Sequence, residues 1–486
     1  MDIGGLIIKL LQGGLGNLAA YLAVHVLLCL LPAFFIAGAM TALIPTETIT
    51  RYLGRNSPKY VSYPAALASG SILAVCSCTI VPLFAGIYKK GAGIGPAMTF
   101  LFFAPAANIL ALIYTGGVIG ADLAIARFLL SLIFGVSIGM IMALIFRKED
   151  IEHKTQTDAQ FVGPGKMNRY GLVLLGILVA LLLSGTLKID LLTKTYTTIT
   201  LPISGIDRFQ NWLSQLVPFD PSKGEEGVSA QGALLILLLI SIGVSAHKGF
   251  ESILNGYNRW TTVTVVLIST TLLIAAAGMV PNAEGLDFQI TGKMIGVSIA
   301  LIVIAILLKY RLKEEEICSF FWESWRFVKQ IFPLLVIGVF AVGIIRQLIK
   351  PEWIQAVAGE NTILGNLTGV IFGIFMYFPT LVEVPIAQMF LRLGMHRGPL
   401  LAYLMADPEL SLQSILITMS IIGRRKTLTY VSIVALFSTA SGLIYGLWID
   451  GAGIGLIILC LIALIAVLAA ALWLINRKNQ QKQRGA

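Results

Sequence analysis

Residues 74–82 read Ala74-Val75-Cys76-Ser77-Cys78-Thr79-Ile80-Val81-Pro82. Two thiols lie one residue apart there, inside an apolar run that glycine, serine and proline interrupt between Tyr63 and Thr115. Backbone that cannot complete its own hydrogen bonds is tolerated at membrane depth only where it faces protein or a water-filled cavity. We therefore predict a broken or re-entrant helix hairpin over about residues 61–90, with its tip at Cys76 to Thr79. Transporters place elements of this kind at the substrate site.

The composition identifies the class of protein. Hydrophobic residues make up 57% of the 486 residues and charged residues only 12%, and the mean hydropathy is +0.86. These values are typical of a polytopic membrane protein and exclude a soluble domain. The net charge of +10 does not indicate nucleic acid, because the basic residues lie in short clusters between apolar runs. The five cysteines are too scattered for a disulfide framework.

Apolar runs predict the membrane spans along the chain. In the first half, spans are expected near residues 18–44, 93–115, 117–146 and 170–187, the second of them broken at Ala104-Pro105. Three additional spans are expected near residues 232–247, 261–280 and 293–309. The second half is expected to contain spans or broken spans at residues 331–349, 363–391, 398–417, 428–449 and 454–475. Residues 147–169 and 189–231 are predicted to be aqueous or interfacial loops, the second with a short amphipathic helix near Trp212.

An internal repeat organises these spans. Laying Pro82 on Pro385 without a gap aligns helix breakers with helix breakers, which chance apolar similarity does not do. The aligned pairs include Gly91 with Gly394, Gly95-Pro96 with Gly398-Pro399, and Pro105 with Pro408. We refer to this alignment as the repeat shift. Each half then reads as a span, a broken hairpin, a broken span and two further spans.

The predicted fold is an all-α polytopic membrane protein with two inverted-topology repeats. Each repeat carries a broken or re-entrant hairpin, at about residues 61–90 and 363–391, and extra spans separate the repeats. The expected divisions are residues 1–188 for the first repeat, 189–330 for a periplasmic loop, the extra spans and a cytoplasmic link, 331–476 for the second repeat, and 477–486 for a basic tail. The basic clusters and the tail are expected in the cytoplasm, in a multi-pass protein of the inner membrane. Inverted repeats with discontinuous helices are typical of alternating-access transporters.

Several motifs resemble those of a known family. The segments Cys76 to Leu83, Lys89-Lys90-Gly91, Gly95-Pro96-Ala97 and Ala104-Pro105-Ala106-Ala107-Asn108 are similar to the signature of the predicted permease family that includes the organoarsenical efflux permeases (ArsP and YraQ-like proteins). The resemblance is dense over about residues 65–115 and weaker from about 330 to 450. It implies an inner-membrane permease, with trivalent organoarsenicals exported by characterised members and a cysteine pair that bears on substrate recognition. The spans near residues 230–310 make this chain longer than the short members.

The chemistry of the cysteine pair is independent of the resemblance. Thiolates are soft ligands that suit thiophilic centres such as Cu(I) and, by the same logic, trivalent arsenic. On a non-helical tip the sulfurs of Cys76 and Cys78 can converge on one atom, whereas a regular helix would direct them about 200° apart. Together with Ser77 and Thr79 they are predicted to bind substrate, at the positive end of a half-helix that starts near Thr79. In the alternative, the cysteines pack as small hydrophobic residues.

Charged residues inside apolar spans form a second group. Glu383 follows Thr380 by three residues at the second tip, and Asp407-Pro408-Glu409 replaces the Ala104-Pro105-Ala106 of the first half. Intramembrane carboxylates usually line a pathway or a proton relay. Glu383, Asp407 and Glu409 are therefore candidates for proton coupling, and Thr380 and Glu383 for substrate binding. In the alternative, one carboxylate caps a half-helix or pairs with Arg127, whose own role is either a structural ion pair or an anion contact.

Proline marks the remaining candidates. Asn108 and Ser411 each follow a proline by three residues, at equivalent positions of the two halves. Because Pro105 and Pro408 free carbonyl groups that need donors, Asn108 and Ser411 either satisfy these carbonyls or contact substrate. Pro82, Pro105, Pro385 and Pro408 are assigned structural roles as helix breakers.

We expect a secondary transporter that exports a small thiophilic solute, in first place a trivalent organoarsenical, with the proton as a candidate coupling ion. One alternative is transport of a small oxyanion or sulfur compound held by half-helix dipoles. Another is a membrane thiol oxidoreductase, against which the absence of C-x-x-C spacing counts. No histidine-rich metal motif, P-loop or G-x-S-x-G elbow occurs, so no metal, cofactor or enzyme activity is predicted. The expected partners are a small-molecule substrate and the lipid bilayer, and not nucleic acid.

Overall fold

The structure is a computed structural model that describes most of the chain. The described residues are 3–24, 26–43, 46–73, 77–160, 169–186, 190–203, 205–217, 227–282, 285–348, 351–375, 383–453, 455–456, 459 and 462–463. They fall into two compact units, the first formed by Met1–Pro45 and Gly165–Gln347 and the second by Thr46–Pro164 and Leu348–Ala486. Seven described helices are long and apolar enough to cross a membrane, or eight when one bent pair of helices is included. The chain is thus a helical polytopic membrane protein.

The first unit holds the predicted extra spans. In chain order its elements are α1 (Ile3–Val24), a π-helix η1 (Val26–Leu30), α2 (Leu31–Leu43), α10 (Arg169–Thr186), α11 (Asp190–Thr193), β1 (Thr195–Leu201), α12 (Ile206–Leu216), α13 (Ala230–Phe250), the 3-10 helix η3 (Ile253–Asn255), α14 (Arg259–Ala276), β2 (Gly278–Asn282), β3 (Gly285–Thr291), α15 (Gly292–Tyr310) and α16 (Glu314–Leu348). Side-chain caps start three of these helices, because Ser229, Asn258 and Thr291 each accept a hydrogen bond from the first turn of α13, α14 and α15.

Apolar side chains on the outside of these helices indicate the lipid-facing surface. Ile295, Ile299, Ile302 and Ile306 of α15 are 42–60% exposed and follow one another at helical spacing. In water such a stripe would be an unfavourable exposed patch. In a bilayer it is the expected outer surface of a spanning helix.

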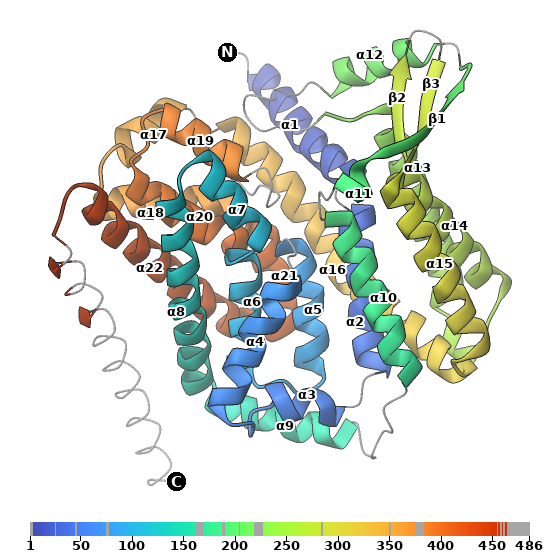
Figure 1. Cartoon of the computed structure of the whole chain (residues 1–486), viewed down its shortest axis with the longest axis horizontal. Coiled ribbons are helices and arrows are strands. Elements are labelled where there is room, and N and C mark those ends of the chain that lie inside the picture. The colour runs from blue at the N-terminus through green and yellow to red at the C-terminus, as the bar shows by residue number, and fades with distance from the viewer. Residues whose placement is uncertain are drawn as a thin grey trace. The chain divides into compact units, whose positions relative to one another are not determined.

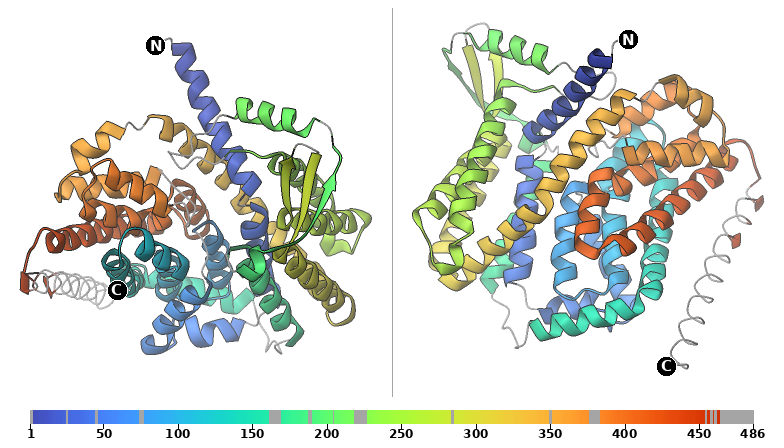
Figure 2. Two further views of the ribbon diagram at one scale, coloured as in Figure 1. Left: turned by 45° about the horizontal axis from the view of Figure 1, so that its top comes forward. Right: turned by 180° about the vertical axis from the view of Figure 1, so that it is seen from behind.

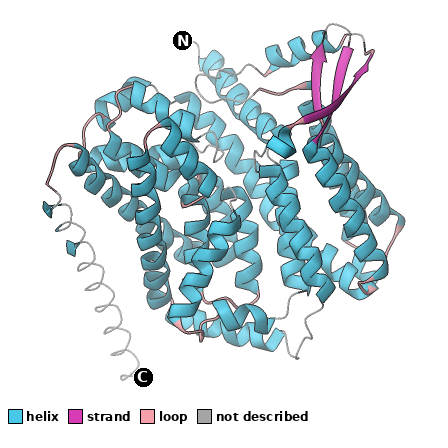
Figure 3. Cartoon of the chain, in the orientation of Figure 1, coloured by secondary structure: helices cyan, strands magenta, loops and turns pink. Residues whose placement is uncertain are grey.

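A small antiparallel sheet was not predicted from the sequence. Its strand order is β1-β3-β2, and Figure 3 shows it beside α12. β-Branched residues make up most of β1, which reads Thr-Tyr-Thr-Thr-Ile-Thr-Leu, and favour a strand. Its partner β3 lies far away in the sequence, pairing Thr198 with Gln289. The helix α12 covers the segment near Trp212 where a short amphipathic helix is predicted.

The second unit covers the segments of both predicted hairpins, whose connections at residues 74–76 and 376–382 lie outside the described residues. Its elements are α3 (Thr46–Leu53), α4 (Lys59–Leu73), α5 (Ser77–Lys89), α6 (Ile94–Ala106), α7 (Ile109–Val118), α8 (Ala121–Ile145), α9 (Arg147–Gln160), α17 (Pro351–Ala358), α18 (Ile363–Phe375), α19 (Glu383–Arg392), α20 (Arg397–Leu410), α21 (Leu412–Ile422) and α22 (Arg424–Ile449). Helices α4, α5 and α8 each contact α6 (Figure 1). The orange-to-red helices α18, α20 and α22 lie together in Figure 2, and α20 contacts both α18 and α22. Residues 147–160 form the helix α9, where the sequence was interpreted as a loop.

The helices of the second unit occur twice in the same order. At the repeat shift, α4 to α8 coincide with α18 to α22, and the glycines with positive φ that follow α5 and α19 coincide as Gly91 (85°) and Gly394 (89°). Contacts between the two sets are reciprocal, since α5 packs on α21 and α19 packs on α7.

Ion pairs connect the ends of helices from the two sets in the second unit. Close to the end of α8, Glu149 lies 3.8 Å from Arg425, at the start of α22. We call this the basic end of the unit, where Arg55 and Lys426 also lie. At the opposite end Asp122, at the start of α8, forms a 2.9 Å ion pair with Arg397, at the start of α20. Helix α8 thus ends where α22 begins.

Candidate functional site

Both copies of the repeat break their helices at equivalent points. Pro105 and Pro408 lie in the last turn of α6 and α20, where a proline lacks an N–H donor and disturbs the preceding turn. The chain continues as α7 and α21, and the axis bends by 44° between α20 and α21. Asn108 caps α7, because its Oδ1 accepts a 3.4 Å hydrogen bond from the Ala111 backbone N–H. Ser411 donates its hydroxyl to that of Ser414 at 2.7 Å.

A buried ion pair joins the two copies beside these breaks. The Nη1 of Arg127, in α8, donates to Oε1 of Glu383, the first residue of α19, at 2.7 Å. Both side chains are completely buried. The Nε of Arg127 donates to the carbonyl of Ala106 at 3.0 Å. Arg127 therefore satisfies a carbonyl at the end of α6 and neutralises a carboxylate at the start of a half-helix of the other repeat.

Glu409 and Tyr430 occupy the equivalent positions in the second repeat. At the repeat shift Glu409 corresponds to Ala106, and Tyr430 corresponds to Arg127. The Tyr430 hydroxyl donates to Oε2 of Glu409 at 3.3 Å, and Glu409 is only 6% exposed. Arg127 and Glu383 lie within electrostatic range of Glu409, which also lies against the backbone of Ala106. The two equivalent contacts thus meet in one polar cluster, consisting of Arg127, Glu383, Glu409 and Tyr430.

Three atoms of this polar cluster lack hydrogen-bond partners within the described part of the chain. They are Nη2 of Arg127, Oε2 of Glu383 and Oε1 of Glu409, and all three are buried. A buried polar group without a partner costs about 1–3 kcal/mol, and more when it is charged. With both carboxyl groups ionised, the cluster would also carry one uncompensated negative charge. It can therefore receive water, a proton or the polar part of a solute.

The structure places the other predicted site residues as follows. Asp407 and Ser411 are fully buried near the end of α20, and Asn108 and Thr79 are buried at the breaks of the first repeat. Ser77 and Cys78 are the first two residues of α5, and the side chains of these two residues lie outside the described part of the structure. Cys76 and Thr380 lie outside the described residues.

Tyr430 was missed in the sequence analysis. The aligned pairs named there end at Pro105 with Pro408, before α8 and α22 begin. Carrying the same ungapped shift into α8 and α22 would have laid Tyr430 on Arg127, and a polar residue at both positions would have marked the pair.

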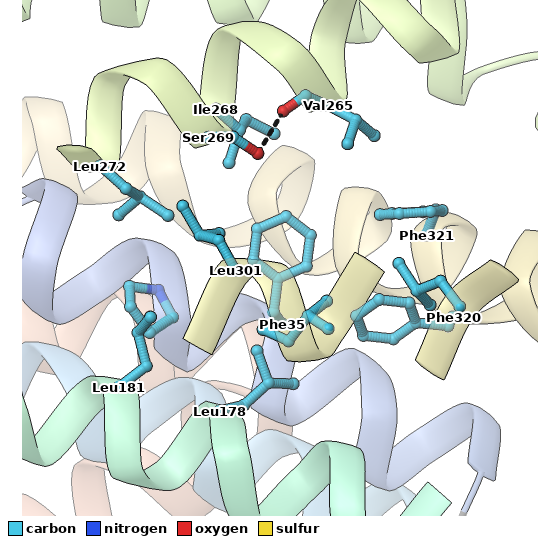
Figure 4. Close-up of a pocket in the computed structure, with 13 residues that line it drawn as sticks. Phe35, Leu178, Leu181, Val265, Ile268, Ser269, Leu272, Leu301, Phe320 and Phe321 are labelled. Carbon is cyan, nitrogen blue, oxygen red and sulfur yellow. Dashed lines mark hydrogen bonds between the residues drawn. The ribbon is translucent and has the colours of Figure 1, made fainter. Parts of the chain in front are cut away.

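An apolar pocket in the first unit is a poorer candidate. Phe35, Leu178, Leu181, Leu272, Leu301 and Phe321 are among the residues that line it (Figure 4). Its serine, Ser269, donates its hydroxyl to the Val265 carbonyl at 2.8 Å, within its own helix. Among the described residues, no charged side chain lines this pocket. The polar cluster is therefore the candidate site.

Broken spans beside a buried charged centre are features of membrane transporters. Comparison with known proteins places the chain more closely: a family described as a predicted permease matches residues 13–216 and 315–447, and the chain belongs to that family. The two matched ranges leave out residues 217–314, which contain α13, α14 and α15.

One relative matches most of the length of the chain. The chain is 33% identical, over 447 residues, to a UPF0718 protein of Methanocaldococcus jannaschii, an alignment that covers 92% of this chain and 99% of the relative. The helices between the two matched ranges are therefore not peculiar to this sequence. No solved structure matches the chain significantly.

Proposed function

We propose that the protein is a secondary transporter that exports a small thiophilic solute, with a trivalent organoarsenical as the preferred substrate class. The observation that carries this proposal is the buried ion pair of Arg127 and Glu383, which links α8 of one repeat to the half-helix α19 of the other. A buried ion pair is weak evidence for stability, because desolvation offsets much of its attraction. Inside a membrane, such residues mark substrate or ion pathways.

Alternating access requires two arrangements of similar energy, and inverted repeats supply them. The opposite directions of α8 and α22, together with the reciprocal packing of α5 on α21 and α19 on α7, support an inverted relation between the repeats. The basic end, with Arg55, Arg425 and Lys426, then faces the cytoplasm by the positive-inside rule. In this orientation the protein lies in the inner membrane with its basic tail in the cytoplasm.

The preference for a thiophilic solute rests on residues 76–79. Ser77 begins α5, so Cys78 lies in the first turn of a half-helix, where the helix dipole favours a thiolate. Two thiolates are suitable ligands for a soft trivalent centre. An oxyanion substrate is less compatible with the polar cluster, because Arg127 is already engaged by Glu383 and a further carboxyl group, Glu409, lies nearby.

Inverted membrane vesicles test the proposal. Vesicles that carry the wild-type chain should accumulate methylarsonous acid, and the Cys76→Ser/Cys78→Ser double variant should not. The matched control is Cys318→Ser, which removes a buried thiol of the first unit and should leave accumulation unchanged. Equal transport by the double variant would refute the thiol site, and accumulation of arsenate in preference to the arsenical would refute the substrate class.

A further inference from the structure

Glu409 differs from Glu383 in what compensates its charge. Glu383 accepts a 2.7 Å hydrogen bond from a guanidinium, whereas Glu409 accepts a 3.3 Å hydrogen bond from a neutral phenol. The second oxygen of Glu409, Oε1, is buried without a partner in the described part of the chain. Both carboxyl groups are at least nine-tenths buried. Solvent therefore does not stabilise the charge of Glu409 in place of a cation.

The surroundings of Glu409 offer few titratable groups. Helix α20 packs against α22, α18, α6, α19, α8 and α21. From these helices Glu409 meets Tyr430 of α22, Arg127 of α8 and Glu383 of α19, while α6, α18 and α21 contain no titratable residue. On α20 itself, Tyr403 is almost two turns away, and Asp407 precedes Glu409 by two residues and therefore points about 200° around the helix.

The two carboxyl groups, Glu383 and Glu409, differ in the cost of burying their charged forms. Removing an ion from water without a compensating charge costs several kcal/mol, and a buried group avoids this cost by becoming neutral. Arg127 can compensate one carboxylate fully, and the geometry assigns it to Glu383. A proton is then the simplest partner for Glu409. A single proton also matches the one oxygen, Oε1, that has no partner in this arrangement.

We propose that Glu409 is the residue that binds the coupling proton of transport, with the Arg127–Glu383 ion pair as its fixed neighbour and Tyr430 as its hydrogen-bond donor. This inference rests on the proposed function and adds the coupling ion and its site. The carboxylate takes one proton from water on one side of the membrane and, after the change of access, returns it to water on the other side. No further reactant is needed. Arg127 keeps the deprotonated state accessible, because its Nη2 is a donor without a partner among the described residues.

The repeat explains why the site occurs once. In the first repeat, the position of Glu409 is taken by Ala106, whose backbone carbonyl binds Arg127. In the second, the position of Arg127 is taken by Tyr430, which leaves Glu409 without a cation of its own. A symmetric scaffold has thus acquired a salt-bridged half and a protonatable half.

A measurement without substrate tests the proton site directly. Infrared difference spectra of the purified, reconstituted protein should show a protonated-carboxyl band that is lost as pH rises. Glu409→Gln should remove this band, and Glu360→Gln, at an exposed position of the same unit, should retain it. Tyr430→Phe keeps the ring, removes the hydrogen bond and should move the pH midpoint of the band. A band that persists in Glu409→Gln, or a midpoint unchanged in Tyr430→Phe, would overturn the proposal.

Transport of methylarsonous acid in proteoliposomes provides the second test. A pH gradient should stimulate uptake by the wild type and by the control Glu360→Gln, and Glu409→Gln should lose this stimulation. Stimulation that survives in Glu409→Gln, or wild-type uptake driven by a sodium gradient instead, would contradict the inference. If no chain transports the arsenical, the proposed substrate is wrong, and the infrared band still decides whether Glu409 binds a proton.

Discussion

Phe134 stacks on Phe437, its own equivalent at the repeat shift, with ring centroids 4.7 Å apart and planes inclined by 12°. A contact between a residue and its own equivalent is expected where a twofold axis relates two copies, so this stacking supports the proposed inverted relation of the repeats. The buried ion pair involves the same helix α8, in which Arg127 lies two turns before Phe134.

Removing one member of the Arg127–Glu383 ion pair should destabilise the protein more than removing both members. Arg127→Met or Glu383→Leu alone leaves one buried charge uncompensated, at a cost of about 3–5 kcal/mol, whereas the double variant removes both charges and should recover most of this loss. Thermal unfolding of the four proteins in detergent measures the cycle. The exposed pair of Arg425 and Glu149 is the control, since a surface pair contributes about 0–1 kcal/mol. Additive losses in the double variant would show that the two charges do not compensate each other.

Replacing a glycine at a close helix crossing should destabilise the protein to a similar extent in both repeats. A Cβ added at Gly139 would lie 2.5 Å from the Gly95 carbonyl oxygen, and one at Gly442 would lie 2.5 Å from the Gly398 carbonyl oxygen. Gly139→Val and Gly442→Val should therefore each destabilise the protein by at least about 1–3 kcal/mol through overpacking. Gly117→Val, at a position with no atom within 4 Å of an added Cβ, is the matched control. A loss at one crossing but not at its equivalent would contradict the shared packing.

Sequence patterns predicted the elements of the second unit better than their contacts. Proline and glycine determine helix breaks locally, so aligning Pro82 with Pro385 was enough to find equivalent helices. The partner of Arg127 is 256 residues away, and only the fold decides which of several buried carboxylates it meets. Sequence reasoning could therefore offer a pairing with Arg127 as one alternative, but could not choose Glu383.

Segments whose structure depends on distant partners were interpreted less well. The segment of β1 was interpreted as a loop from its local sequence. It forms a strand because it pairs with β3, which comes from a distant part of the chain. Residues 147–160 were also interpreted as loop because they are polar. Tertiary contacts explain their helix: Asp150 accepts a 2.8 Å hydrogen bond from the Ile94 backbone N–H, and His153 stacks on Tyr88.

Chemical labelling should place the two ends of the second unit on opposite sides of the membrane. Thr155, near the basic end, and Gly453, beyond the end of α22, are both exposed. In a background without native cysteines, an impermeant maleimide added to intact cells should label Gly453→Cys and not Thr155→Cys. Permeabilised cells should show labelling of both, which controls for reactivity. Labelling of both positions in intact cells, or of Thr155→Cys alone, would contradict the proposed orientation.

Acid should weaken the attachment of α9 to the rest of the second unit. Burial, with a smaller effect from Lys426, lowers the pKa of His153 from 6.5 to about 4. Below pH 6.5 the unfolded chain binds a proton at this position that the folded chain does not bind until about pH 4, so stability falls as pH decreases through this window. Burial also raises the pKa of Asp150 and has the opposite effect at the acid end, so the comparison between variants is the informative one.

His153→Phe isolates this contribution. Phenylalanine keeps the ring that stacks on Tyr88 at a centroid distance of 4.1 Å, and it cannot bind the proton. The wild type should therefore lose thermal stability between pH 6.5 and about 4 more steeply than the variant does. His247→Phe, at an exposed position of the first unit, is the control. If wild type and His153→Phe follow the same pH dependence, His153 binds its proton equally in both states and α9 is not held by a neutral imidazole.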